Sequence, residues 1–553
     1  MLRVRRLLLL SLLAAAAMPA SASAAVTVGS AKITPSTTAA GGHPDVTVDL
    51  SFGESPASDD LKSLTSVLPQ GLVGDPRAAD RCSEASFRAD SCPASSRVGT
   101  TTVTAQVTIV ATEVPQDSSG DVYNLVPHAG EPARLGGVVR PQAPAPKMFL
   151  ESPVTIGPQT SYGLATTFDD LSRTAGALQI RITRMVLKLN GHATHGAFLT
   201  NPTGCGAATA SFTATSYDDA AHPSSATASF TPTNCAALPF APTLSGTIGG
   251  RGNTAKGASP ELVTTIARPA GNANIASSVV ALPGAVTANI AHPTCAEDVL
   301  AAGNCPVEAR VGSARSTSSL LSSPLAGPVW LVTPTGGGLP ELVVQLRGAI
   351  DADFVGTPGV ASGHLANTFS GLPDLPIGTF ELTIAGGHGG LLTNVADLCA
   401  PGSDVTAPTS FTAHSGATRS LSVPLAVKGC PPPLPSGWLE LRFHHGRGTL
   451  TGHFAAAHHA PRLARVRVTL PDSLSHTRHH PAELVTAYAD RHRLGKRAVR
   501  IRGRRLEIVV PNGARGIAFR WRRLKGPARS RPSFAVEVVD FAKRDTRLTL
   551  KSR

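Results

Sequence analysis

The chain has 553 residues, which is too long for one domain of ordinary size, and we expect about three or four domains. Charged residues make up 16% of the chain and aromatic residues 4%, while Ala, Gly, Pro, Ser and Thr dominate. This composition favours strands and turns and disfavours long amphipathic helices.

The first 24 residues have the pattern of a signal peptide. Three arginines within residues 3–6 precede an apolar run that ends at Ala17, and residues 22–24 fit the small-x-small rule, so we expect cleavage before Ala25. The run is shorter than the ~20 residues that span a bilayer, which disfavours an uncleaved anchor. With no further apolar segment and no covalent anchor in the sequence, we expect a secreted, extracellular protein that associates with a cell surface peripherally at most.

Strand patterns follow along the mature chain. Apolar and polar residues alternate over residues 46–52, 178–182 and 380–384, as strands with one buried face require, and the second run resumes at 185–189 after an interruption at Thr183-Arg184. Gly and Pro clusters at residues 130–146 and 336–340 predict loops. Repeated short strands with long connections favour a mainly β fold, with tandem β-sandwich modules of immunoglobulin-like or Greek-key type.

The eight cysteines fall into two sets that repeat the same spacing. Nine residues separate the first two cysteines of each set, and about thirty residues separate the last two. The phrases at residues 92–99 and 305–312 are similar, and so are those at 195–201 and 388–394. Because these landmarks keep their order at a period near two hundred residues, we interpret them as a duplication.

An even number of cysteines and an export signal predict an oxidised framework. Eight cysteines allow about 105 connectivities, but the duplication favours the same pairing in each half. The predicted disulfides are Cys82–Cys92, Cys205–Cys235, Cys295–Cys305 and Cys399–Cys430. Each would stabilise the fold by roughly 2.5 to 4 kcal/mol. A cysteine zinc site is disfavoured because no CxxC pair occurs, and a short helical turn is expected at residues 83–87 and at 296–300.

The phrases at residues 68–76, 369–376 and 386–394 resemble a group of secreted actinobacterial repeat proteins that contain disulfides. The resemblance covers roughly residues 60–430 and implies export and duplication. That group has no established activity, so no catalytic residue is carried over. The second copy departs from the phrase at its start, where Ala285-Val286 replaces Gly-Leu.

Composition changes after a Pro-rich hinge at residues 431–435. Residues 436–553 hold 26 of the 50 Lys and Arg but 8 of the 37 Asp and Glu, a net charge of +18. The pattern still predicts strands, including a hairpin over residues 499–508 with arginines at its turn. The expected domains are therefore a signal peptide at 1–24, duplicated β modules at 25–248 and 249–430, the hinge, and a basic β-rich domain at 436–553.

A concentrated positive surface outside the cell is expected to attract an acidic cell-envelope polymer or another anionic surface. The predicted polyanion-binding residues are Arg502, Arg504, Arg505, Arg520, Trp521, Arg522, Arg523 and Lys525, with Trp521 as a stacking residue. The alternative is that the arginines form a solvated sheet face and that Trp521 belongs to the core. No nucleic-acid module signature occurs, so specific nucleic-acid recognition is not expected.

Other functions are less favoured by the sequence. Histidine doublets at residues 444–445, 458–459 and 479–480 place neighbouring side chains on opposite faces of a strand, so we expect no metal site and no cofactor. Without GxSxG, HExxH or GxxxxGK motifs, we expect a non-catalytic protein, although the carboxylate pairs at 169–170 and 218–219 leave an extracellular hydrolase open.

Homotypic adhesion through sheet edges is the main alternative function, because tandem β modules can associate in this way. The glycines at residues 250–252 are interpreted as a linker between the two copies rather than as part of a nucleotide-binding motif.

Overall fold

The computed structural model describes residues 26–54, 60–109, 112–143, 145–430, 434–458, 460–477, 481–527 and 531–553. The signal peptide predicted at residues 1–24 lies outside the described residues, as do residues 431–433 of the predicted hinge. The described chain is mainly β, as predicted, and it divides into two units, Met1–Cys430 and Pro431–Arg553.

The first unit contains two large sheets, and the first of these folds back on itself. Its strands in order are β1 (Val26–Pro35), β2 (Val46–Glu54), β11 (Leu178–Leu189), β5 (Arg97–Ile109), β6 (Thr112–Leu125), β7 (Ala133–Arg140), β8 (Met148–Thr155), β9 (Ala165–Phe168), β3 (Leu61–Val67), β15 (Ala208–Ser216) and β16 (Ser224–Phe230), with β10 (Thr174–Ala175) beside β11. The two edges meet where the Val28 N–H donates to Ser224 Oγ over 3.0 Å. The result is a barrel-like body with an interior.

The second large sheet has the same strand order as the first. Its strands are β17 (Thr243–Gly249), β18 (Glu261–Ala267), β27 (Ile377–Ile384), β22 (Arg310–Ser318), β23 (Leu325–Thr333), β24 (Glu341–Leu346), β25 (Ala352–Ala361), β26 (His364–Phe369), β19 (Ile275–Ala281), β29 (Thr406–Ala413) and β30 (Thr418–Pro424). Each strand occupies the position of its counterpart in chain order, from β1 with β17 to β16 with β30. One addition is β31 (Ala426–Lys428), which runs parallel to β17.

Smaller elements also recur in the two copies. The short pairs are β4 (Val73–Gly74) with β14 (Leu199–Thr200) in the first copy and β20 (Val286–Ala288) with β28 (Leu392–Asn394) in the second, while β12 (His192–Ala193) pairs with β13 (Gly196–Ala197), and β21 (Cys295–Ala296) runs parallel to β23. Helices α1 (Glu84–Arg88) and α2 (Glu297–Ala301) lie inside the short cysteine loops, where helical turns were predicted.

The short 3-10 helices are η1 (Ala94–Ser96), η2 (Pro158–Thr160), η3 (Cys235–Ala237), η4 (Val307–Ala309) and η5 (Lys496–Ala498). Of these, η1 and η4 directly follow the second cysteine and proline of their loops in both copies.

Local sequence explains why these strands form where they do. In β2, Val46, Val48 and Leu50 are buried and alternate with more exposed neighbours, as a strand with one buried face requires. The interruption predicted within residues 178–189 is a register shift between Ile182 and Arg184, where β11 pairs with β5. Such a bulge lets one strand continue while its inward and outward positions change.

Two expectations from the sequence are corrected by the strand pairing. Residues 250–252 do not link the copies, because β17 precedes them and pairs with β18, so they turn within the second sheet. The predicted boundary at 248/249 falls at the end of β17. The predicted loop at 130–146 contains a strand, β7, which is buried on both sides through Gly136 to Val139 and pairs with β6 and β8.

All four predicted disulfides are present: Cys82–Cys92, Cys205–Cys235, Cys295–Cys305 and Cys399–Cys430, with Cα–Cα distances of 5.4 to 5.9 Å. Disulfides of this number are typical of proteins that fold in an oxidising compartment, so they indicate an extracellular protein. Within the part of the chain that the structure describes, no helix is both long and apolar enough to cross a membrane.

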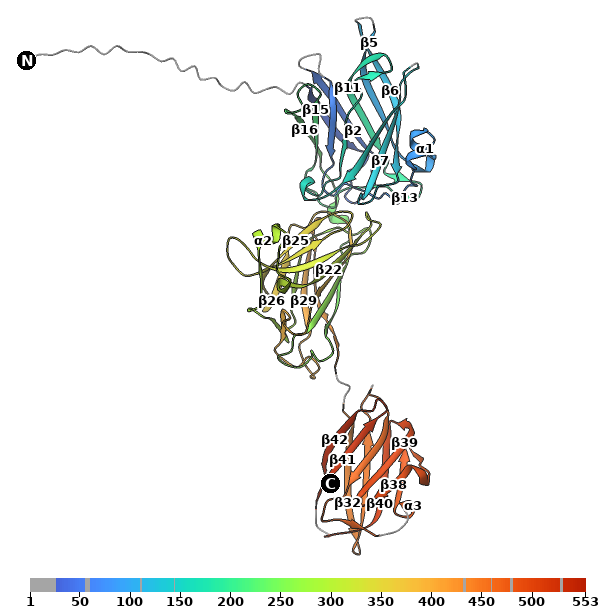
Figure 1. Ribbon diagram of the computed structural model, residues 1–553, viewed down its shortest axis with the longest axis vertical. Coiled ribbons are helices and arrows are strands. Elements are labelled where there is room, and N and C mark those ends of the chain that lie inside the picture. The colour runs from blue at the N-terminus through green and yellow to red at the C-terminus, as the bar shows by residue number, and fades with distance from the viewer. Residues whose placement is uncertain are drawn as a thin grey trace, which may run out of the picture. The chain divides into compact units, whose positions relative to one another are not determined.

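The second unit, orange to red in Figure 1, has two sheets around one core. One sheet contains β32 (Ser436–His444), β33 (Arg447–Ala455), β40 (Gly516–Lys525), β36 (Val485–Ala489) and β37 (His492–Arg493), with β35 (Ser475–His476) beside β40. The other contains β38 (Val499–Arg502), β39 (Arg505–Ala514), β34 (Leu463–Thr469), β41 (Ser533–Asp540) and β42 (Asp545–Lys551). Helix α3 (Pro481–Leu484) precedes β36. We call these the β40 sheet and the β39 sheet.

Candidate functional site

The β40 strand carries four of the predicted basic residues, and its local geometry exposes all of them. Alternate residues of β40 point into the core, namely Ile517, Phe519 and Trp521. Because neighbouring residues of a strand point to opposite faces, Arg520 and Arg522 point outward. The strand then bulges, since its register with β33 shifts between Gly448 and Leu450 and Arg523 adopts a φ of 60°.

The bulge adds a second exposed arginine before the strand turns inward again. Arg522 and Arg523 are both exposed, Leu524 returns to the core, and Lys525 is exposed. A bulge has this effect because one extra residue on one strand faces a single residue on its partner.

The other predicted basic residues lie on the β38–β39 hairpin, which forms as predicted. Arg502 pairs with Arg505 across the strands, and Gly503 begins the two-residue turn with a φ of 58°. Arg502 and Arg505 are exposed, whereas Arg504 forms an ion pair with Asp472. Arg504 is therefore already engaged within the fold.

The basic residues of β40 and those of the β38–β39 hairpin come close only at one end of the second unit. They belong to different sheets, but His476 of β35 connects them: its ring Nε2 lies 2.7 Å from the Gly503 carbonyl oxygen, and it pairs with Leu524 across the strands. The hairpin turn and Lys525 thus lie at the same end of the unit. Arg520 lies further along β40.

Trp521 does not belong to this surface, which corrects the prediction that it stacks on a ligand. Its side chain is 0% exposed and packs in the core of the unit. The physical reason is the two-residue period of a strand, which puts Trp521 on the same inward face as Phe519 while the arginines face out. The alternative interpretation from the sequence was the right one for this residue.

Charge pairing distinguishes the two outer surfaces. A row of alternating charges crosses the β39 sheet, in the order Arg500, Glu507, Arg467, Glu537 and Arg547. Arg467 donates from Nε to Glu507 Oε1 over 2.8 Å and from Nη1 to Glu537 Oε1 over 2.6 Å. The hydrogen bond to Glu507 raises the pKa of Arg467.

Apart from Arg504, the predicted basic residues form no ion pair with the described carboxylates. Among the described residues, no carboxylate forms an ion pair with Arg502, Arg505, Arg520, Arg522, Arg523 or Lys525, which we call the unpaired basic set. Four of these six cations lie together on β40. An exposed cation without an internal partner is available to an external anion.

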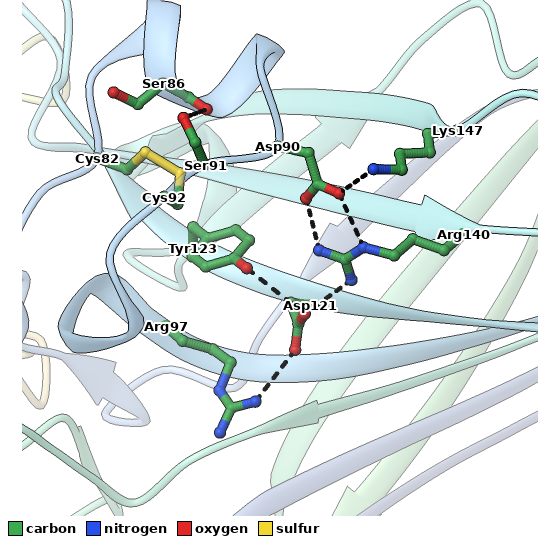
Figure 2. Close-up of polar contacts among 10 residues, drawn as sticks. All are labelled: Cys82, Ser86, Asp90, Ser91, Cys92, Arg97, Asp121, Tyr123, Arg140 and Lys147. Carbon is green, nitrogen blue, oxygen red and sulfur yellow. Dashed lines mark hydrogen bonds and ion pairs between the residues drawn. A yellow bond between two sulfur atoms is a disulfide. The ribbon is translucent and has the colours of Figure 1, made fainter.

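A second polar cluster, absent from the sequence predictions, lies beside the first disulfide (Figure 2). Asp90 accepts hydrogen bonds from Arg140 Nη2 over 2.6 Å and from Lys147 Nζ over 2.6 Å. Arg140 also contacts Asp121 over 2.7 Å, and Asp121 contacts Arg97 over 3.3 Å. The bonds from Arg140 and Lys147 lower the pKa of Asp90 to about 2.

The second copy keeps the arginine of this cluster but changes its partners. Arg347 follows β24 as Arg140 ends β7, and it pairs with Asp353 and Asp351. Gly303 stands two residues before the second loop cysteine, where the first copy has Asp90. Because these charges satisfy one another, the cluster fixes the cysteine loop onto the sheet of the first copy.

A buried carboxylate joins the two copies. Asp374 is 4% exposed and accepts hydrogen bonds from the Thr203 N–H (2.8 Å), the Thr203 hydroxyl (2.6 Å), the Gly204 N–H (3.2 Å) and Asn274 Nδ2 (2.8 Å). Thr203 and Gly204 precede the Cys205 of the first copy, whereas Asp374 belongs to the second. No pattern in the sequence predicts this contact, since Asp374 stands in an ordinary turn phrase.

The histidine doublets and carboxylate pairs of the sequence analysis are the residues that bear on metal binding and acid–base chemistry. Among the described residues, no group of three or more His, Cys, Asp or Glu side chains could hold a metal ion. Asp219 of one predicted carboxylate pair lies 2.6 Å from His222 Nδ1 on an exposed turn. His459, His479 and His480 of the predicted doublets lie outside the described residues, so the absence of a metal site stays a prediction.

Comparison with known proteins does not assign a family. No family model and no curated protein matches the sequence. The solved structures that align with the chain include three at 8% identity. A membrane-anchored protein from Corynebacterium diphtheriae aligns over 82% of this chain and 96% of its own with a TM-score of 0.15. The complex of Dpr2 Ig1-Ig2 with DIP-Theta Ig1-Ig3 aligns over 95% and 98% with a TM-score of 0.21.

The third is a structure of manganese lipoxygenase of Gaeumannomyces graminis with part of zonadhesin of Komagataella pastoris, which aligns over 56% of this chain and 92% of its own with a TM-score of 0.17. Scores this low do not indicate a shared fold.

Proposed function

We propose that the protein is a non-catalytic, extracellular binding protein whose second unit attaches it electrostatically to an acidic polymer of a cell envelope. The observation that carries this proposal is the unpaired basic set on β40 and on the β38–β39 hairpin. Five of the eight acidic side chains in residues 436–553 already pair with an arginine, namely Glu440, Asp472, Glu507, Glu537 and Asp540. The excess positive charge of the unit is therefore available to an anion outside the protein.

The charge distribution along the chain supports the same function. Residues 436–553 carry a net charge of +18, and the remaining residues carry −5, since the whole chain carries +13. A unit of such charge is drawn to a polyanion over long range, and binding releases the counterions that the polymer has condensed. The four described disulfides fit a place outside the cytosol.

The test uses immobilised polyphosphate, a simple polymer with repeated anionic charge, and the full mature chain. A variant in which Arg520, Arg522, Arg523 and Lys525 are all replaced by Gln removes four exposed cations from β40. Each cation near a strongly anionic surface contributes about 1 kcal/mol, so affinity should fall about a hundredfold to a thousandfold.

The matched control changes the net charge equally but elsewhere on the unit. Arg497 of η5, Lys543 before β42, and Arg547 and Lys551 of β42 are exposed cations that lie off β40. Because they are not gathered on one strand, their replacement by Gln should reduce affinity far less. Equal losses in the two variants would show that total charge, rather than β40, determines attachment. An unchanged affinity in the β40 variant would remove the basis of the proposal.

A further inference from the structure

The first unit contains two apolar cavities, one of about 130 Å³ lined by the first copy together with part of the second, and one of about 190 Å³ lined by the second copy. The first-copy part of the first lining is equivalent to the second lining by strand pairing. Leu135 lines the first cavity and pairs with β6. Leu342 lines the second cavity and pairs with β23, the counterpart of β6. Leu199 of β14 and Leu392 of β28 hold equivalent places in the two linings as well.

Loose packing does not explain cavity linings that recur at matching positions in both copies. Protein interiors pack like organic crystals, and a void of this size deprives its lining of dispersion contacts. An apolar cavity of about 150 Å³ is large enough to bind benzene, so both are on the scale of a ligand. Their retention in both copies indicates an occupant.

The linings determine what chemistry such an occupant has. Among the described residues, the first cavity has no charged side chain, and the second has only Arg268. Arg268 donates from Nε to the Ile377 carbonyl (3.1 Å) and from Nη1 to the Asn272 carbonyl (2.6 Å), and it has no ion pair with a described carboxylate. Nearby, Asn367 Oδ1 is buried with no hydrogen-bond partner.

The cavities also adjoin each other. Phe354, Leu375 and Ile377 contribute to both linings, so the two spaces meet at these side chains. Leu375 follows Asp374, whose hydrogen bonds hold the two copies together at this place. Two apolar spaces that meet in this way accommodate one extended chain better than two unrelated compact rings.

From these observations we infer that residues 26–430 bind a long hydrocarbon chain with an anionic head group, a fatty-acid-like ligand. The chain occupies the apolar cavities, and the head group lies beside Arg268, the one cation of the second lining. Hydrophobic burial supplies the affinity and Arg268 selects the charged end. This ligand and this unit differ from those of the attachment proposed above, so either can fail without the other.

The experiment titrates the full mature chain with cis-parinaric acid, a fluorescent fatty acid, at a salt concentration that screens the basic unit. We expect saturable binding that palmitate displaces, and a higher melting temperature with palmitate present, because a ligand that binds the folded state stabilises it. Replacing Leu342 with Trp fills the second cavity and should weaken binding at least tenfold.

Matched variants separate the cavity from the rest of the surface. Val360→Trp adds the same side chain at a residue 78% exposed on β25 and should leave binding unchanged. Leu135→Trp makes the equivalent change in the first cavity and should also weaken binding. Arg268→Met should weaken palmitate about tenfold but not hexadecanol, which lacks the charge.

Several results would overturn the inference. The first is the absence of saturable binding and of any thermal shift in the unaltered chain, a measurement that does not depend on how the variants fold. The second is equal binding by folded Leu342→Trp and by the unaltered chain. Loss of hexadecanol binding together with palmitate in Arg268→Met would remove the assigned role of that residue.

Discussion

Replacement of Asp374 tests whether a single carboxylate holds the two copies together. In Asp374→Ala, the Thr203 N–H, the Gly204 N–H and the Asn274 amide lose their acceptor inside a buried contact. Each stranded buried donor costs about 1 to 3 kcal/mol, and water entering the vacated space recovers part of that cost. We expect the free energy of unfolding of the first unit to fall by about 3 to 5 kcal/mol.

The conservative variant sharpens the prediction. In Asp374→Asn one oxygen remains, but an amide NH₂ must face donors, because Asp374 Oδ2 accepts from both the Thr203 and Gly204 N–H groups and Oδ1 accepts from Asn274 Nδ2. We therefore expect Asn to destabilise nearly as much as Ala.

The assay is urea unfolding of the mature chain, followed by far-UV circular dichroism, with Asp169→Ala as control. Asp169 is exposed on the first copy, and its loss should change stability by no more than about 0.5 kcal/mol. If the unfolding free energy of Asp374→Ala lies within that margin of the unaltered chain, the carboxylate does not hold the copies together.

Three further predictions concern stability. Because the pKa of Asp90 is lowered from 3.8 to about 2, its ion pairs stabilise the fold above about pH 4 and lose that effect as the pH falls toward 2. Solvent screening limits the contribution to about 1 kcal/mol, so Asp90→Asn should flatten unfolding free energies measured between pH 5 and pH 2, whereas a profile parallel to the unaltered chain would contradict this. Arg467→Met leaves Glu507 and Glu537 without their shared partner and should cost about 1 to 2 kcal/mol in thermal unfolding, against almost nothing for exposed Arg547→Met. Removing Cys205–Cys235, which closes a separation of 30 residues, should destabilise by about 1 kcal/mol more than removing Cys82–Cys92, which closes 10, in chemical unfolding of the paired serine variants; the reverse order would contradict the chain-entropy argument.

Features that depend on neighbouring residues could be predicted from the sequence. The alternation at residues 46–52 gives β2, and the break at Thr183 gives the bulge of β11, because a strand has a period of two wherever it lies. The cysteine pairs also followed from the sequence, since the repeat restricted each cysteine to a partner in its own half.

Features that depend on distant contacts could not be predicted. The contact of β1 with β16 joins segments far apart in the sequence, and so does the first cavity, which residues of both copies line; neither leaves a local pattern. Asp374 looks like any turn aspartate until the loop at Thr203 is placed against it. Trp521 stands among arginines in the sequence, and only the direction of the core decides which of these neighbours is buried.

If the second unit attaches the protein to an anionic envelope, removal of that unit abolishes binding. The most direct measurement compares the mature chain with a chain ending at Pro435 for binding to purified cell envelopes between 50 and 200 mM salt. With six unpaired cations engaged on a dense polyanion, we expect the mature chain to lose about a thousandfold in affinity over that range, and the shortened chain not to bind. Equal, salt-insensitive binding by both chains would contradict the account and place the binding surface in the duplicated modules.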